Sequence, residues 1–525
     1  MCGILVSLGL DSDILLSDLI TNRGPNYNDS VAITTKESVL RFSASVLHMR
    51  GDFCPQPLSN DEFIFAFNGE IYSNHTGYNY KVNNDTMFIF NSIASGFDLV
   101  ELFKDLKGPY SFCLYNRKES RLIFGRDSIG RRSLLMSLES DHFILSSVAL
   151  DYSKYIWNEL EPGVIYCYSL DSKSLFEIYK LPSPLKCELI FIETASEYTI
   201  PKEIIDRSVM LLEIVVQKRI HFLRSADHPV NVLFSGGVDS LLLAILVHRV
   251  LGRDLEINLI NVSFENPRVK SLCEESSDRK LGKEAFAFLS STFKKRTWNF
   301  IAVNVSIKDY IEHAPRIYGL SYPQITMRDL SIASPLWFAA RVIDPKQKVV
   351  LLGMGADEIL GGYTRHRVAY NRGSWERLHE ELMLDSLRIG TRNLGRDDRI
   401  LSDHKIEPRF PFLDEDFANY CTSLPIQYKF NSSLPQGKGE KFLFRSILKF
   451  LNVPDNLCSS HKRAIQFGSK SAKIHNSRET GDDICSLEMF LNNINPAKWV
   501  KQPCLLHLQQ SQLDGEKELE QQKRE

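Results

Sequence analysis

The chain lacks several features that would assign it to a class of function. Lys and Arg number 63 against 65 Asp and Glu, so the net charge is −2 and no basic excess indicates binding to nucleic acid or to an anionic membrane. No run of 18 uninterrupted apolar residues predicts a membrane-spanning helix. The start lacks the basic segment and long apolar core of a secretory signal. We therefore expect a cytoplasmic protein without nucleic-acid or membrane partners, and the sequence leaves its oligomeric state open.

Two sequence motifs are also missing. The ten cysteines form no CxxC pair, which argues against a zinc site or a disulfide framework and favours reduced thiols. There is no GxxxxGK[ST] segment, so a Walker-type phosphate loop is excluded. What remains is a chain of 525 residues, 43% hydrophobic and 24% charged, as expected for a globular protein of two or three domains.

The hydrophobic pattern changes along the chain. Before about residue 168 the pattern predicts short strands at 63–67, 111–115, 121–124 and 143–150. From about residue 201 it predicts helices at 204–221 and 240–251 alternating with strands at 230–234, 256–264, 298–305 and 348–352. Strands that alternate with helices predict a parallel sheet with crossover helices.

These changes predict the domain organisation. We expect a first domain over residues 1–168, a linker over 169–203 that includes Leu181-Pro182-Ser183-Pro184, and a second domain over 204–470. The remaining residues, 471–525, are predicted to be a polar tail, whose last part, 509–525, is disordered or a solvated helix.

Cys2 is the first candidate for chemistry. A Met before a small residue is normally removed, which would leave Cys2 with a free α-amine. Its thiol could then attack an amide while the amine, with an ordinary pKa of about 7.7–8.0, accepts the proton.

Four further residues could assist such a thiol. The Asn68 side-chain amide and the Gly69 N–H could bind an oxyanion, although an isolated Asn-Gly pair is typical of a hairpin turn. Arg50 could hold a substrate carboxylate and Asp85 an α-ammonium, although each alone is more often a surface charge.

The order of these residues resembles the class II glutamine amidotransferase domain, an N-terminal-nucleophile hydrolase of αββα architecture. The matching segments are Cys2-Gly3-Ile4, Arg23-Gly24-Pro25, Arg50, Asn68-Gly69-Glu70, Asp85 and Gly125-Arg126-Asp127 with Gly130. The resemblance implies that Cys2 is the glutaminase nucleophile, that Asn68 and Gly69 form the oxyanion hole, and that Arg50, Glu70 and Asp85 bind glutamine. Asn26 departs from the family's usual Asp.

A second motif follows a predicted strand. Ser235-Gly236-Gly237-Val238-Asp239-Ser240 leads into an apolar helix, whose free N–H groups and dipole favour a phosphate group. Asp239 would repel phosphate unless a cation such as Mg²⁺ lay between them. The segment resembles the pyrophosphate loop of ATP pyrophosphatases, a loop that several families with different substrates share.

Later segments resemble the glutamine-hydrolysing asparagine synthetase family over about residues 2–470. They are Gly353–Tyr363, Glu407–Asp414, Gly439–Arg445 and Lys462–Ser469, and Asn393–Arg399 favours the branch of asparagine synthetase domain-containing proteins. The resemblance implies a Rossmann-like ATP pyrophosphatase domain and an ATP site, for which the implied residues are Leu233, Ser235, Gly236, Gly237, Asp239, Ser240, Val262, Gly353 and Lys441. It further implies that Asp239 and Asp357 bind Mg²⁺ and that Arg328 binds aspartate.

One departure concerns the chemistry of the second domain. Met354 stands where the family has a Glu near the reacting carboxyl, and Leu352 replaces a small hydroxyl residue. The expected function is ATP-dependent amidation of aspartate through an aspartyl adenylate, with ammonia from glutamine and with ATP and Mg²⁺ as cofactors. The alternatives are a family member that binds nucleotide or partners without making asparagine, and an amidotransferase with another acceptor.

Overall fold

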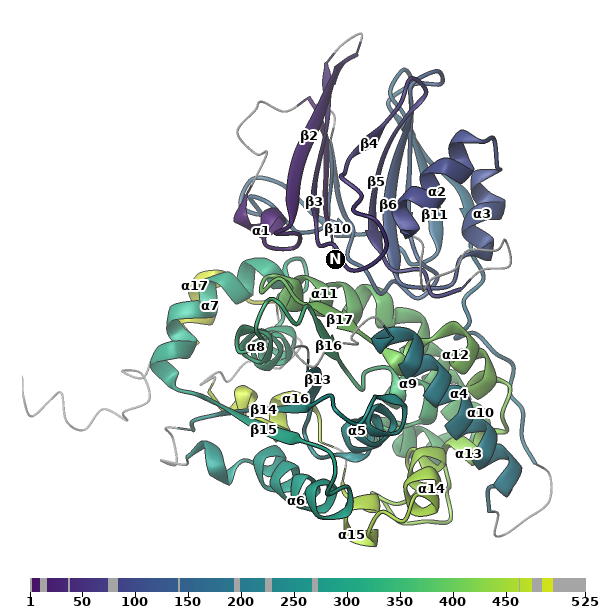
Figure 1. Cartoon of the computed structure of the whole chain (residues 1–525), viewed down its shortest axis with the longest axis vertical. Coiled ribbons are helices and arrows are strands. Elements are labelled where there is room, and N and C mark those ends of the chain that lie inside the picture. Colours follow the sequence, from purple (N-terminus) through teal and green to yellow (C-terminus); the bar gives the residue numbers. More distant parts are fainter. Residues whose placement is uncertain are drawn as a thin grey trace, which may run out of the picture.

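In the computed structural model, the N-terminal part of the chain is a sandwich of two antiparallel sheets (Figure 1). One sheet has the order β10-β8-β9-β1-β3-β2, with β1 (Gly3–Leu8), β2 (Tyr27–Thr34), β3 (Val39–Val46), β8 (Leu135–Leu138), β9 (Phe143–Ser146) and β10 (Asn158–Glu159). The other has the order β12-β11-β7-β6-β5-β4, with β4 (Leu58–Ser59), β5 (Phe63–Gly69), β6 (Tyr110–Asn116), β7 (Arg121–Arg126), β11 (Val164–Ser169) and β12 (Ser174–Lys180).

The structure describes most of the chain, with gaps. The described residues are 2–9, 17–35, 38–73, 84–139, 142–192, 199–221, 229–266, 272–461, 463–474 and 484–493.

Alternating side chains position the two sheets. In β1, Ile4 and Val6 pack into the core between the sheets, whereas Leu5 packs on the opposite face against Ile20 of α1 (Asp18–Thr21). The outer face of the second sheet is covered by α2 (Asp85–Ala94) and α3 (Leu99–Asp105) (Figure 1). On the outer side of the first sheet, the short helix α1 packs together with Val148, Tyr155 and Trp157 from the segment after β9.

The C-terminal part contains a parallel sheet in the order β15-β14-β13-β16-β17. Its strands are β13 (Val230–Leu233), β14 (Ile257–Phe264), β15 (Trp298–Val305), β16 (Val349–Leu351) and β17 (Glu407–Arg409). The helices around it are α4 (Lys202–Ile220), α5 (Val238–Val250), α6 (Ser277–Thr292), α7 (Ile307–Ser321), α8 (Met327–Arg341), α9 (Ala356–Leu360), α10 (Thr364–Ile389), α11 (Gly395–Ser402), α12 (Glu415–Thr422), α13 (Ile426–Lys429), α14 (Phe442–Phe450), α15 (Asp455–Cys458), α16 (Ile465–Gly468) and α17 (Leu487–Asn493). Every residue of β14 is buried, as expected for a strand covered on both faces. The predicted combination of an N-terminal-nucleophile sandwich with a parallel α/β sheet is confirmed.

Two segments differ from the predicted organisation. The linker predicted over 169–203 contains β12, which pairs with β11 and extends the sandwich to Lys180. Most of the side chains of β12 are exposed, so the strand has no hydrophobic alternation to reveal it.

The predicted polar tail over 471–525 is also ordered in part. Cys485 and Phe490 are fully buried in the core of the second domain, and the Cys485 carbonyl accepts a hydrogen bond from the Tyr318 hydroxyl at 3.0 Å. The prediction for 509–525 lies outside the described residues.

The two domains meet along a buried polar interface, and the amino-terminal end of the chain lies at this junction (Figure 1). Arg131 of the first domain donates a hydrogen bond to the Leu413 carbonyl of the second at 2.8 Å, and Lys107 pairs with Asp416 at 2.8 Å. Within the described residues, the helices are too short or too polar to cross a bilayer.

Candidate active sites

The first candidate site is built around Cys2, directly before β1. Cys2 is buried, and its backbone N–H donates to the Asn68 Oδ1 atom at 2.9 Å. The Nε2 atom of Gln56 lies 3.5 Å from the Cys2 Sγ atom, and its Oε1 atom accepts from the Phe67 N–H at 2.7 Å. Two side-chain amides therefore hold the backbone nitrogen and the thiol of Cys2. Gln56 was not predicted, because a single Gln before a Pro has no recognisable sequence pattern.

Asn68 and Gly69 lie at the end of β5, beside Cys2. The Asn68 side chain is fully buried, and its Nδ2 atom has no hydrogen-bond partner among the described residues. Because the Oδ1 atom already accepts from Cys2, the amide is oriented with an uncommitted donor, which a buried site rarely leaves unused. A Cβ at Gly69 would lie 2.5 Å from the Pro109 carbonyl oxygen, so only glycine fits there. This arrangement can bind an oxyanion.

Three charged side chains line the same cavity as Cys2 and Gly69. The Arg50 guanidinium lies 3.0 Å from the Glu70 carboxylate and 3.2 Å from that of Asp85, and it also donates to the Ile71 carbonyl at 2.6 Å. A cation between two buried carboxylates can bind both charged groups of an α-amino acid. The structure thus brings together all six residues predicted for the first site, and their roles remain predictions.

Burial raises the pKa of Glu70 to about 7; Arg50 lowers this pKa, and Glu407 and Asp85 raise it further. If the Glu70 carboxylate binds the substrate ammonium, kcat/KM for glutamine is expected to rise between about pH 6 and pH 8 as Glu70 ionises. The free energy of unfolding should fall from about pH 4.5 to about pH 7 and level off above, because between these values the folded state keeps a proton that the unfolded chain has released. Glu70→Gln should abolish this rise in kcat/KM with pH. If the variant keeps the native pH profile of kcat/KM, Glu70 does not bind the substrate ammonium.

The second candidate site begins where β13 ends. Gly236 has a φ of 79°, and a Cβ there would lie 2.5 Å from the Leu281 carbonyl oxygen. Gly237 caps α5 without a side chain, and the Ser235 hydroxyl accepts from the Gly237 N–H at 3.3 Å. The glycines therefore expose the start of a 13-residue helix, where free N–H groups and the helix dipole favour phosphate.

Lys441 lies between two carboxylates beside this loop. Its Nζ atom is 2.6 Å from an Asp239 oxygen and 2.9 Å from an Asp357 oxygen, and Lys441 is 2% exposed. The other oxygen of Asp239, Oδ1, is buried without a hydrogen-bond partner in the described part of the chain. Two carboxylates, one with an uncommitted oxygen, are hard ligands of the kind that Mg²⁺ prefers, so the residues present fit this ion.

Asp239 and Asp357 border a cavity of about 190 Å³ at the carboxyl ends of β13 and β16, the usual ligand position in an open parallel sheet. Its lining includes six residues of the predicted ATP and metal sets, namely Leu233, Ser235, Asp239, Ser240, Gly353 and Asp357. The other predicted residues of the second domain are outside its lining, namely Gly236, Gly237, Val262, Arg328 and Lys441.

Met354, the residue at which the sequence departs from the family pattern, lines this cavity together with charged side chains. One of them is Glu358, whose carboxylate accepts from the Tyr363 hydroxyl at 2.6 Å. Arg396 and Asp397 of α11 form a second pair at 2.8 Å, and burial raises the pKa of Asp397. Carboxylates therefore face the cavity even though residue 354 is a thioether.

Known proteins match both parts of the chain. The asparagine synthase family model matches residues 211–374 and 369–524, and a glutamine amidotransferase domain model matches residues 45–150. Asparagine synthetase domain-containing protein 1 from Homo sapiens is 31% identical over 95% of this chain and 100% of its own length. A Saccharomyces cerevisiae asparagine synthetase domain-containing protein is 32% identical over 87% of this chain and 88% of its own.

A more distant relative carries an activity in its name. Glutamine-hydrolysing asparagine synthetase 1 from Arabidopsis thaliana is 27% identical over 85% of this chain and 74% of its own length. Because the asparagine synthase family model matches more than half of the chain, after a glutamine amidotransferase domain, the chain belongs to the asparagine synthase family.

Proposed function

We propose that this protein is a glutamine-hydrolysing enzyme of the asparagine synthetase type, which amidates aspartate at the expense of ATP. The observation that carries the proposal is the presence of two separately built sites. One places Cys2 against the uncommitted Asn68 donor, and the other places Lys441 between Asp239 and Asp357 beside a phosphate loop. The nine described cysteines are all free thiols, which supports a reducing, cytoplasmic setting.

In the first site, Cys2 would need a base, because burial raises the pKa of its thiol. After removal of Met1, the α-amine of Cys2 takes the thiol proton, and the sulfur attacks the side-chain amide carbon of glutamine. The Asn68 Nδ2 and Gly69 N–H groups bind the oxyanion, and the protonated amine gives its proton to the departing ammonia. Water then cleaves the thioester and releases glutamate.

In the second site, the aspartate side-chain carboxylate attacks the α-phosphorus of ATP, and pyrophosphate leaves. Lys441 neutralises charge on the phosphates as they separate. Asp239 and Asp357 would hold Mg²⁺, which supplies further charge neutralisation when bound. Ammonia from the first site attacks the acyl carbon of the adenylate, and asparagine and AMP are released.

The proposal is tested with pure protein, ATP, Mg²⁺, aspartate and amide-labelled glutamine, by assaying glutamate, pyrophosphate and asparagine separately. All three products are expected, with label in the asparagine amide. Glutamate without pyrophosphate or asparagine would indicate another acceptor acid, whereas pyrophosphate without asparagine would indicate that aspartate is adenylated but not amidated. ATP binding without any of the three products would indicate a member that only binds nucleotide.

Met354 gives a prediction for the amide-forming step. A thioether cannot move a proton, and a general acid or base contributes about 10²–10⁴-fold to rate. We expect slow asparagine formation by the native chain and a rise of about 10²-fold in Met354→Glu, with glutamine hydrolysis unchanged. The measurement is labelled asparagine per unit of pyrophosphate. Rapid synthesis by the native chain would mean that a neighbouring carboxylate such as Glu358 replaces the family residue.

A further inference from the structure

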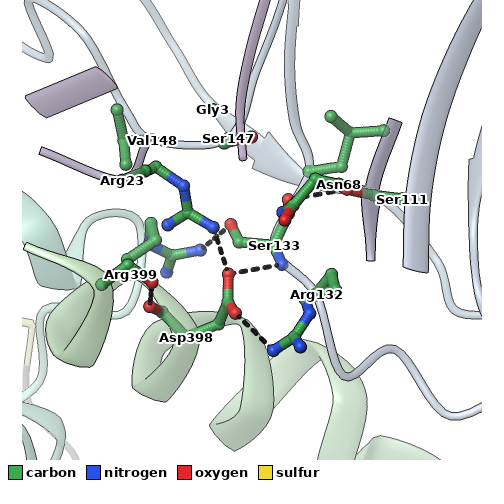
Figure 2. Close-up of polar contacts among 12 residues, drawn as sticks. Gly3, Arg23, Asn68, Ser111, Arg132, Ser133, Ser147, Val148, Asp398 and Arg399 are labelled. Atoms are coloured by element: carbon green, nitrogen blue, oxygen red, sulfur yellow. Dashed lines mark hydrogen bonds and ion pairs between the residues drawn. The ribbon is translucent and has the colours of Figure 1, made fainter. Parts of the chain in front are cut away.

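Asp398 of α11 lies in the second domain, but its carboxylate is held by the first. One oxygen is 2.6 Å from the Arg23 guanidinium and accepts from the Ser133 N–H at 3.1 Å, and the other lies 3.3 Å from the Arg132 guanidinium (Figure 2). The Asp398 side chain is fully buried. Groups of one domain therefore compensate a buried charge of the other.

Arg23 connects this carboxylate to the nucleophile. Its Nη2 atom donates to Asp398, while its Nε atom donates to the backbone carbonyl of Cys2 at 3.3 Å. A guanidinium is planar, so fixing one edge of it on Asp398 fixes the direction of its Nε–H. The carbonyl that receives this N–H belongs to the residue that carries the thiol.

Cys2 lies just outside β1, which begins at Gly3. Two side chains contact its backbone: Asn68 accepts from its N–H, and Arg23 donates to its carbonyl. Together they set the orientation of Cys2 about its Cα. A small misplacement of a reacting group costs about 10²-fold in rate.

We propose that Asp398 is a positioning residue for glutamine hydrolysis, which acts through Arg23 on the backbone of Cys2. The inference rests on the proposed glutaminase reaction and adds that a residue of the synthetase domain holds the nucleophile in place. The same helix presents Arg396 and Asp397 to the nucleotide cavity, so α11 lies between the two sites.

The test compares Asp398→Asn with Asp416→Asn in the full chain. Asp416 is a matched control, because it also makes an ion pair across the interface, with Lys107, and is not bonded to Arg23, the residue that contacts Cys2. We expect kcat for glutamine hydrolysis to fall about tenfold or more in Asp398→Asn, with KM within about twofold of the native value. Asp416→Asn should keep the native kcat. Equal kcat values for the two variants would overturn the inference.

Arg23 supplies a second, independent measurement. If Asp398 acts through Arg23, the double variant Arg23→Gln with Asp398→Asn should have the same kcat as Arg23→Gln alone. If the double variant instead has a lower kcat than Arg23→Gln, so that the two losses in kcat multiply, Asp398 acts by another route and the proposal is overturned. The double variant also removes both members of the buried pair, so neither charge is stranded.

Asp398→Asn alone removes the carboxylate that compensates the buried charge of Arg23, and this variant could fail to fold. In that case Arg23→Lys decides, because the lysine ammonium can keep the charge pair with Asp398, but lysine has no nitrogen at the position of the arginine Nε atom that donates to the Cys2 carbonyl. A normal melting temperature with a kcat reduced about tenfold is expected, and a native kcat would overturn the inference. If the native chain releases no glutamate from glutamine, the proposed function itself fails; if it does and the variants match the control, only this inference fails.

Discussion

Cys2→Ala is expected to reduce glutamine hydrolysis by about 10⁴-fold or more, because removal of a nucleophile leaves only binding and oxyanion stabilisation. The backbone nitrogen of Cys2 is bonded to the Asn68 side chain, and Cys2 lines the same cavity as Arg50 and Glu70. Pyrophosphate formation from ATP and aspartate should be unchanged, because that site lies in the other domain. The measurements are glutamate release from glutamine alone and pyrophosphate release with ammonium as nitrogen donor.

Cys54→Ala is the matched control for this variant. Cys54 is a second buried thiol near Cys2, and burial raises its pKa to about 12. It has no amine of its own to act as base, so its loss should leave hydrolysis within a few-fold of native. A chain in which Met1 is retained should behave like Cys2→Ala, since the α-amine is then a peptide nitrogen. Mass spectrometry must find that active protein begins at Cys2, and activity in protein that keeps Met1 would refute the mechanism.

The sequence predicted the elements whose pattern is local. The strand predicted at 298–305 is β15, with the same bounds, and the strands predicted at 111–115 and 121–124 lie within β6 and β7, which pair as a hairpin. Both have hydrophobic patterns that a short window detects. β12 was missed because its side chains are mostly exposed, and α17 was missed because it has only seven residues and follows a polar stretch of sequence.

The candidate sites were predictable where residues follow one another in recognised motifs. Cys2 and Asn68 are 66 residues apart, and family resemblance alone suggested that they meet. The contact of Arg23 with Asp398 spans 375 residues and depends on how two domains dock, which no local pattern encodes. Neither Val262 nor Arg328 lines the second cavity, so their predicted contacts with adenosine and aspartate need a direct binding experiment.

Lys441→Ala should have the largest effect on the second site. The native ammonium is buried between Asp239 and Asp357, at 2.6 Å and 2.9 Å, and its removal leaves two carboxylates facing the phosphate loop. Their repulsion of ATP should weaken its binding by about 1–3 kcal/mol, as for a lost charge-assisted hydrogen bond. Loss of a preorganised cation at the leaving phosphates should further reduce pyrophosphate release by about 10²–10³-fold.

Lys438→Ala provides the comparison, because Lys438 is an exposed lysine three positions earlier in the same segment. It should bind ATP and release pyrophosphate as the native chain does. Glutamine hydrolysis at Cys2 should be normal in both variants, which would show that the fold survives the loss of Lys441. Native pyrophosphate release by Lys441→Ala would mean that the cluster of Lys441, Asp239 and Asp357 is only structural, and the nucleotide would then have to bind elsewhere. A loss of ATP binding and pyrophosphate release that is confined to Lys441→Ala would instead show that this buried lysine joins Asp239, after β13, to Asp357, after β16, in a single ATP site.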